Sequence, residues 1–284
     1  MTQRTVEEQV QGYRTQDGAG VSLVRVLSNR STDIYDPFLM LDSFDTTDYD
    51  SVRAGFPFHP HRGIETISYL KRGKMTHRDS LGNEDTIGDG EVQWMTAGSG
   101  ILHEETIPYS DRMLGTQLWL NLPRKDKMVQ PKYHPIKNED IKEIEIEGGK
   151  LRLLAGSYLD NEGYKADYLP MDYYDIELAK DKEFTIETDP ERSITVFTLL
   201  GSIEIDGLKV PEKTAAKLSK GDTLTMKALE DDTSILFMSS KKLEEPIAWG
   251  GPIVMNSREE LYQAFSELET GNFIKDEIDF EAEE

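Results

Sequence analysis

Two short segments hold three of the chain's five histidines, together with a carboxylate at matching spacing. His59 and His61 stand two residues apart, and so do His103 and Glu105. Alternate side chains of an extended strand share one face, so each pair would point in a single direction. Two such strands facing each other would bring three imidazoles and one carboxylate together. This donor set is typical of a site for a borderline divalent transition metal, and we expect iron.

The identity of the carboxylate ligand depends on strand parity. Parity favours Glu105 over Glu104, which should point to the opposite face. Glu65 lies four residues after His61, so it shares the inner face of that strand if the strand is regular. It is either a competing ligand or a residue that holds an imidazole N–H and supports a ligand from behind. The spacing alone leaves both roles of Glu65 open.

The residues around the two segments favour an ordered site over a solvated surface strand beside an unrelated loop. Pro57 and Pro60 stiffen the chain next to the first histidine pair and reduce the entropy lost when the ligands become ordered. Gly98 and Gly100 allow a close bend of the backbone before His103. These features are those of a built metal site.

The other polar residues near these segments have plainer interpretations. We assign His77 and His134 no partner at ligand spacing, and we expect them to be ordinary surface or loop histidines. For Arg62, which follows His61 directly, we expect a local ion pair and no contact with a substrate.

The composition limits which donors and partners are available. There are no cysteines, so thiolate ligands and disulfides are excluded. The net charge is −22, and residues 141–284 alone carry 33 acidic and 16 basic side chains, a net charge of −17. Nucleic acids and anionic membrane surfaces both attract cationic side chains, so we expect neither kind of partner. The first residues lack the apolar core of a signal peptide and no segment is apolar for long enough to span a membrane, so we expect a cytoplasmic protein.

Short β-branched and aromatic runs separated by glycines predict an all-β fold. The sequence Leu81-Gly82-Asn83 is typical of the tip of a hairpin. A weak internal repeat relates residues 67–92 to residues 196–224, which predicts two copies of one β-barrel unit. The second copy contains no histidine, because the last one is His134. We therefore expect the metal in the first barrel only.

The domain division follows from the repeat. We place an N-terminal metal-binding barrel at residues 1–134 and a C-terminal barrel at residues 141–284. The polar, proline-containing segment at residues 132–140 is interpreted as the junction.

One helix is predicted near the end of the chain, inside the second domain. Ser257 and Glu260 form a capping box at its start, and Gly271 supplies its stop. An apolar stripe is formed by Leu261, Phe265 and Leu268. The acidic tail that follows, Asp276 to Glu284, is expected to be loose.

The two ligand segments together resemble the signature of the pirins, a branch of the cupin superfamily. The matching residues are Gly55, His59-Pro60-His61-Arg62-Gly63, Glu65-Thr66, Gln93-Trp94-Met95-Thr96-Ala97-Gly98, Gly100-Ile101-Leu102-His103 and Glu105. Further matches lie at Asp36-Pro37-Phe38-Leu39, Leu118-Trp119-Leu120-Asn121-Leu122 and Gly251-Pro252-Ile253-Val254-Met255-Asn256, so the resemblance covers nearly the whole chain.

The resemblance implies two stacked cupin barrels of the jelly-roll type, with a metal only in the first. It places the metal ligands on His59, His61, His103 and Glu105. It implies Fe(II), with another divalent transition metal as the alternative. Three imidazoles and one carboxylate would leave two positions of an octahedral Fe(II) free, one for substrate and one for O2.

The resemblance also implies an activity, because pirins resemble flavonol 2,3-dioxygenases at this site. We expect a quercetin 2,3-dioxygenase type of reaction, in which a flavonol is cleaved with O2 and carbon monoxide is released. Glu105 would then be a catalytic base as well as a ligand. The alternative is a non-enzymatic, metal-dependent regulator that binds a protein partner.

A flat polyphenol requires an apolar and aromatic pocket. The candidate substrate contacts are Phe56, Trp94 and Gln117, and plain core packing is the alternative for each. Gln117 stands out because a buried amide requires a hydrogen-bond partner.

Overall fold

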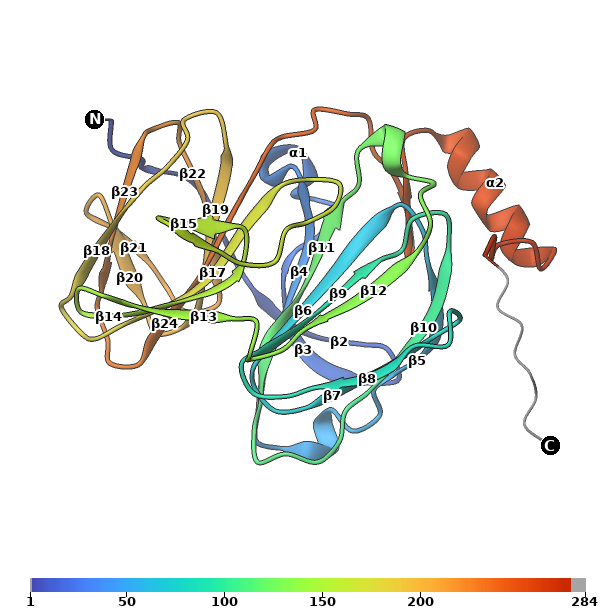
Figure 1. The fold of residues 1–284 in the computed structure, drawn as a ribbon, viewed down its shortest axis with the longest axis horizontal. Coiled ribbons are helices and arrows are strands. Elements are labelled where there is room, and N and C mark those ends of the chain that lie inside the picture. Colours follow the sequence, from blue (N-terminus) through green and yellow to red (C-terminus); the bar gives the residue numbers. More distant parts are fainter. Residues whose placement is uncertain (1, 277–284) are drawn as a thin grey trace. The chain divides into compact units, whose positions relative to one another are not determined.

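The structure is a computed structural model and describes residues 2–276 (Figure 1). Nearly all regular elements are strands, which confirms the all-β prediction. The expected loose acidic tail lies, apart from Asp276, outside the described residues. Among the described residues, no helix is both long enough and apolar enough to cross a membrane.

The chain forms two compact units, and no single cut in the sequence separates them. Unit 1 contains residues 1–13, 24–43 and 136–243, and unit 2 contains residues 14–23, 44–135 and the segment that begins at Glu244. The C-terminal segment, which the sequence division placed with the second barrel, therefore belongs to the unit that carries the candidate metal ligands. Residues 132–136, expected within the junction, form a strand.

Unit 2 positions the candidate site. A four-stranded sheet has the order β5 (Phe56–His61), β10 (Ile101–Thr106), β7 (Met75–Asp79) and β8 (Glu84–Ile87). A second sheet includes β12 (Lys132–Ile136), β9 (Glu91–Thr96), β6 (Ile64–Arg72) and β11 (Met113–Asn121), in that order. The short elements are 3-10 helices η1 (Tyr49–Ser51) and η2 (Arg124–Asp126), and strands β25 (Ala248–Gly250) and β26 (Ile253–Met255).

Unit 1 repeats this arrangement. Its four-stranded sheet has the order β18 (Glu183–Glu187), β23 (Thr223–Ala228), β20 (Ile203–Ile205) and β21 (Leu208–Val210). Its seven-stranded sheet has the order β1 (Val6–Gln11), β22 (Thr214–Leu218), β19 (Ser193–Leu200), β24 (Thr233–Ser240), β17 (Met171–Leu178), β14 (Gly149–Ala155) and β13 (Lys142–Ile146). The short elements are helix α1 (Thr32–Tyr35) and strands β15 (Ser157–Tyr158) and β16 (Asn161–Glu162).

Strands β2 (Tyr13–Asp17), β3 (Val21–Leu27) and β4 (Phe38–Thr46) contain residues of both units.

The two units share one strand order, which confirms two copies of one β-barrel unit. The predicted alignment is correct where it matches β6 with β19, but it is wrong at its far end, where it matches residue 92 of β9 with residue 224 of β23, the counterpart of β10. The sheet β5-β10-β7-β8 corresponds to β18-β23-β20-β21, and the run β9-β6-β11 corresponds to β22-β19-β24. Strand β5 carries two imidazoles, whereas its counterpart β18 carries Phe184 and Ile186, which are buried in an apolar core with Leu224 and Met226. Unit 1 has therefore filled with apolar side chains the region that corresponds to the histidine-bearing strands of unit 2.

The predicted C-terminal helix is confirmed as α2 (Arg258–Glu269). Ser257 and Glu260 form the capping box, and Gly271 has a φ of +75° just beyond the end of the helix. The predicted apolar stripe packs on a small buried core in unit 2 that contains Ile253 and Phe273.

Candidate metal centre

Strands β5 and β10 bring the histidines together by direct pairing. They run antiparallel, and His103 lies opposite His59 in the register. The ligand atoms of His59, His61 and His103 all lie within 4.8 Å of one another. The strand-parity argument is therefore correct for all three histidines. They form the one cluster of potential metal ligands found among residues 2–276.

Two of the three rings are oriented by main-chain carbonyl groups. His59 Nδ1 lies 2.9 Å from the carbonyl oxygen of Pro57, and His61 Nδ1 lies 3.0 Å from that of Pro252. A carbonyl oxygen can only accept, so both Nδ1 atoms must donate a proton. In a neutral imidazole the lone pair is then on Nε2, and this is the atom that can bind a metal.

The third ring has a different neighbour. His103 Nδ1 lies 3.3 Å from Nδ1 of His77. His103 Nε2 is buried and has no hydrogen-bond partner in the described part of the chain. A buried polar atom without a partner is costly in a folded protein and calls for an explanation. A metal ion bound at Nε2 would supply the missing partner, so the donor set fits a metal.

Burial also keeps the imidazoles of His61 and His103 in the neutral form that binds metal. Burial, together with the neighbouring His59, lowers the pKa of His61 to about 3, although the hydrogen bond to the carbonyl of Pro252 acts to raise it. Burial likewise holds the pKa of His103 well below its ordinary value, with a further contribution from the rings around it. Neutral imidazoles offer lone pairs to a cation, whereas imidazolium ions would repel it.

Glu105 is buried, but it is held by two amides and is not part of the three-histidine cluster. Gln93 Nε2 donates to its Oε1 at 2.5 Å, and Gln117 Nε2 donates to its Oε2 at 2.8 Å. Its neighbour Glu104 points away and pairs with Arg78 at 2.9 Å, as parity predicted. Glu105 as the fourth ligand stays a prediction.

Gln117 has the partner that a buried amide requires, and that partner is Glu105. Gln93 also donates to Glu105, from strand β9, which β6 separates from the β11 strand of Gln117. Gln93 was not singled out from the sequence. The signal was present, because Gln93 is an amide between the apolar residues Val92 and Trp94 of its strand, where a buried amide calls for a partner.

Glu65 and Phe56, two further residues predicted near the site, both have contacts within the protein. Glu65 is buried and its Oε1 accepts a hydrogen bond from Thr96 Oγ1 at 2.7 Å. Phe56 is half-buried and its ring packs edge-on to Phe44, with centroids 6.3 Å apart. The supporting role of Glu65 and the substrate contact of Phe56 stay predictions.

Trp94 is almost fully buried on β9 and follows Gln93 directly. Strand alternation places its indole on the face of β9 opposite to the Gln93 amide that holds Glu105. Its substrate contact also stays a prediction.

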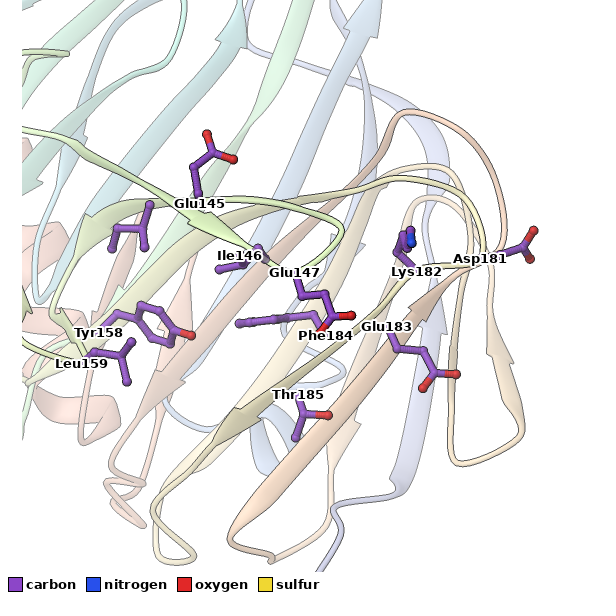
Figure 2. A pocket seen from close by; sticks show the side chains of 11 residues that line it. Glu145, Ile146, Glu147, Tyr158, Leu159, Asp181, Lys182, Glu183, Phe184 and Thr185 are labelled. Carbon is purple, nitrogen blue, oxygen red and sulfur yellow. The ribbon is translucent and has the colours of Figure 1, made fainter.

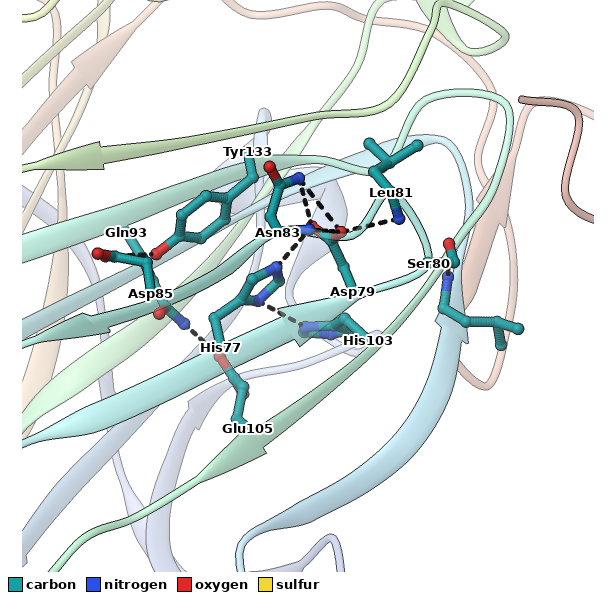
Figure 3. A network of polar contacts seen from close by, with 11 residues as sticks. His77, Asp79, Ser80, Leu81, Asn83, Asp85, Gln93, His103, Glu105 and Tyr133 are labelled. Atoms are coloured by element: carbon teal, nitrogen blue, oxygen red, sulfur yellow. Dashed lines mark hydrogen bonds and ion pairs between the residues drawn. The ribbon is translucent and has the colours of Figure 1, made fainter. Parts of the chain in front are cut away.

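The expectation that His77 is a surface or loop histidine is wrong. His77 is fully buried on β7, its Nε2 lies 2.8 Å from Asp79 Oδ2, and it contacts His103 (Figure 3). The ring of Tyr133 stacks on it at a centroid distance of 4.2 Å. The sequence did contain a signal, because His77 and Asp79 stand two residues apart on a predicted hairpin strand and therefore share a face.

Unit 1 contains a groove of a different character (Figure 2). It has a volume of about 670 Å³ and an apolar floor that includes Ile146, Tyr158 and Phe184. Acidic side chains line its edge, among them Glu145 and Glu183. None of its lining residues is a histidine, so it offers no imidazole donors.

Comparison with known proteins agrees with this geometry. The chain matches the Pirin family over residues 20–120 and the Pirin C-terminal cupin domain over residues 173–274. It is 38% identical over 279 residues to a Pseudomonas aeruginosa protein provisionally named quercetin 2,3-dioxygenase, covering 94% of this chain and 97% of that one. It is 32% identical to the pirin of Rattus norvegicus, covering 87% of this chain and 86% of that one.

A solved structure extends the agreement to the fold. The crystal structure of quercetin 2,3-dioxygenase from Acinetobacter baumannii superimposes with a TM-score of 0.87 at 33% identity, covering 95% of this chain and 98% of that one. The matches span both units and include the segments that carry the three-histidine cluster. On these grounds the chain belongs to the pirin family.

Proposed function

We propose that this protein is an iron-dependent dioxygenase of the quercetin 2,3-dioxygenase type. A flavonol and O2 would be converted to the ring-opened ester and carbon monoxide, with both oxygen atoms of O2 entering the ester and the oxygen of the 3-hydroxyl leaving in the carbon monoxide. The observation that carries the proposal is the convergence of three imidazoles, one of which has a buried Nε2 without a hydrogen-bond partner among residues 2–276. The names of the Pseudomonas and Acinetobacter relatives support the substrate class.

In this proposal His59, His61 and His103 hold the metal through Nε2, and Glu105 is the fourth ligand. Bound iron would supply the activation of O2 and would acidify the flavonol 3-hydroxyl. Oxygen donors and imidazoles suit iron, and without cysteine there are no thiolates to favour a softer ion.

Glu105 would also accept the 3-hydroxyl proton. Its Oε1 already accepts from both amides, whereas its Oε2 accepts from Gln117 alone and retains capacity for one more partner, so this one position on Oε2 would serve the metal and the 3-hydroxyl proton in turn. The two amides hold the carboxylate in place, so that the proton is taken at Oε2 with no reorientation of the side chain.

The test is anaerobic loading with Fe(II), followed by measurement of O2 uptake and carbon monoxide release with quercetin. We expect both only in the loaded protein. His103→Ala should lose stoichiometric metal and turnover, while the matched control His134→Ala, outside the cluster, should retain both. Full metal occupancy without turnover of flavonols would reject the dioxygenase, and stoichiometric metal in His103→Ala would reject the site.

A further inference from the structure

The carboxylate of Asp79 is anchored by donors alone. Its Oδ1 accepts from the backbone N–H of Leu81 at 2.8 Å and of Asn83 at 3.1 Å, and the Asn83 side-chain amide donates to Oδ2 at 3.0 Å (Figure 3). His77 Nε2 lies 2.8 Å from the same Oδ2. Burial raises the pKa of Asp79, but the hydrogen bonds from His77 and Asn83 outweigh burial and hold it below its ordinary value. Asp79 is therefore an ionised acceptor, fixed by the hairpin between β7 and β8.

This acceptor determines where the proton of His77 resides. A carboxylate cannot donate, so Nε2 of His77 must carry a hydrogen. With this single proton on the ring, the lone pair of His77 lies on Nδ1, which faces Nδ1 of His103 at 3.3 Å. For this contact to be a hydrogen bond, His103 must donate from Nδ1. His103 is left with a lone pair on Nε2, the buried atom that has no partner among the residues described.

The other two candidate ligands explain why this chain of contacts is needed. The Nδ1 atoms of His59 and His61 each contact a main-chain carbonyl oxygen, which can only accept a hydrogen bond. His103 is backed by another imidazole, which can either donate or accept. Without a fixed anion behind it, His77 could present an N–H to His103 and drive the His103 proton onto Nε2. That tautomer cannot bind a metal.

The orientation of the His77 ring is also fixed. Tyr133 stacks on it with an interplanar angle of 9°, and Tyr133 Oη donates to Asp85 Oδ2 at 3.1 Å. The imidazole therefore has a defined plane as well as a defined tautomer.

We propose that Asp79 and His77 are positioning residues that hold His103 in the Nδ1–H tautomer and so direct its Nε2 lone pair toward the metal. This inference rests on the metal site of the proposed function. Residues that orient a metal-binding histidine in this way commonly change metal affinity about 10–100-fold when they are replaced.

The test is Asp79→Asn in the full chain, with Zn(II) as a diamagnetic metal. Asparagine can keep the backbone hydrogen bonds through its oxygen while it turns an N–H toward His77 Nε2. His77 would then accept at Nε2 and donate from Nδ1 to His103, the reverse of the wild-type arrangement. We expect NMR of the metal-free, ¹⁵N-histidine-labelled protein to show His103 protonated at Nδ1 in the wild type and at Nε2 in Asp79→Asn. We expect competition with a chelator to show Zn(II) binding about 10–100-fold weaker in the variant.

Thr76→Ala is the matched control, because it removes the Thr76–Thr86 hydrogen bond of the same hairpin, 2.7 Å long, and leaves the contacts of Asp79 and His77 in place. It should keep the wild-type tautomer and affinity. A second pair of variants decides the matter if Asp79→Asn does not fold. His77→Asn keeps a side-chain oxygen near the position of Nδ1 and should bind Zn(II) more tightly than His77→Phe, which has no acceptor.

An unchanged tautomer in Asp79→Asn, or a changed tautomer with unchanged Zn(II) affinity, would overturn the inference. Equal affinities of His77→Asn and His77→Phe would do the same. A wild-type protein that binds no metal would instead reject the metal site itself, and the tautomer measured in the metal-free protein keeps these two failures apart.

Discussion

His61 Nδ1 lies 3.0 Å from the carbonyl oxygen of Pro252, a residue 191 positions later in the chain. This contact makes the C-terminal segment part of the candidate metal centre, because it fixes the tautomer of one of the three imidazoles. The next residue, Arg62, strengthens the connection. Its carbonyl accepts from the backbone N–H of Val254 at 3.1 Å. The strand that carries two candidate ligands is thus tied to the segment that precedes α2.

Arg62 follows β5 directly, and its guanidinium makes polar contacts with the C-terminal segment. It is 2% exposed, pairs with Glu267 at 2.7 Å, donates to the carbonyl of Phe273 at 2.9 Å and lies 4.2 Å from the centre of the Phe273 ring. Loss of a buried charge that makes such contacts costs about 3 kcal/mol. We expect Arg62→Met to lower the free energy of unfolding by that amount, as measured by urea denaturation.

The control for Arg62→Met is Arg53→Ala. Arg53 pairs with Asp50 at 3.0 Å, but their side chains are 63% and 79% exposed. An exposed pair of this kind contributes at most about 1 kcal/mol. Equal effects of the two substitutions would show that the Arg62 tie does not stabilise the fold.

The same ion pair predicts a pH dependence of stability. Partial burial raises the pKa of Glu267, but hydrogen bonds from Lys275 and Arg62 outweigh it and bring the pKa to about 2. A carboxyl with a depressed pKa in the folded state stabilises the protein above its unfolded pKa, here 4.5, and that contribution is lost as the pH falls toward about 2. The stability difference between the wild type and Glu267→Gln should therefore be largest near neutral pH and should shrink below pH 4.5. A difference that stays constant from pH 7 to pH 2 would contradict this assignment.

The local patterns explain which features could be predicted from the sequence. The pairing of His59, His61 and His103 followed from strand alternation, and the start of α2 followed from the capping box of Ser257 and Glu260. The shared face of His59 and His61 and the capping box each depend on residues a few positions apart, where backbone geometry fixes the outcome. The approach of His103 depends in addition on the pairing of β5 with β10.

The features that were missed depend on contacts between distant segments. Pro252 acts through its carbonyl, and every residue has one, so its residue type carries no signal for this role. The membership of the C-terminal segment in unit 2 likewise depends on packing that no local pattern encodes. His77 is different, because its spacing from Asp79 obeys the same parity that identified the ligands. The pair has no second histidine close to it along the chain, so its place beside the three-histidine cluster depends on the pairing of β7 with β10.

Gly63 is a position where only glycine fits between β5 and the C-terminal segment. Its φ is +77°, and a Cβ added there would lie 2.0 Å from the carbonyl oxygen of Val254. Gly271 has a nearly equal φ of +75°, but a Cβ there would meet nothing within 4 Å. Gly271→Ala should thus cost only the strain of the left-handed backbone, about 1–2 kcal/mol. We expect Gly63→Ala to cost clearly more and also to weaken metal binding, because the clash lies two residues after His61.

Thermal unfolding of the two alanine variants, together with Zn(II) competition, checks this expectation. Since the backbone strain is matched, the difference between them isolates the steric contact with Val254. Equal unfolding temperatures and equal affinities would mean that the C-terminal segment can move away from Gly63 without consequence for the site.

Gln117 offers a way to separate a substrate contact from support of Glu105. Its amide donates to both carboxylate oxygens of Glu105, at 3.1 Å and 2.8 Å. Gln117→Met keeps the approximate volume and removes both hydrogen bonds to Glu105, together with the one to Ser68 Oγ at 3.2 Å. If the amide holds the proton-accepting carboxylate in place, the loss falls on kcat, by about 10–100-fold, with KM little changed.

If the amide binds the flavonol instead, KM rises while kcat is retained. Gln93→Met provides the comparison, because Gln93 contacts the same Glu105 oxygen from β9 at 2.5 Å. Two residues that act through one carboxylate should not be additive, so the double variant should lose less than the product of the single losses. The rate of O2 uptake with quercetin measures these losses. If the loss in the double variant equals the product of the two single losses, the amides act separately, and their joint support of Glu105 is rejected.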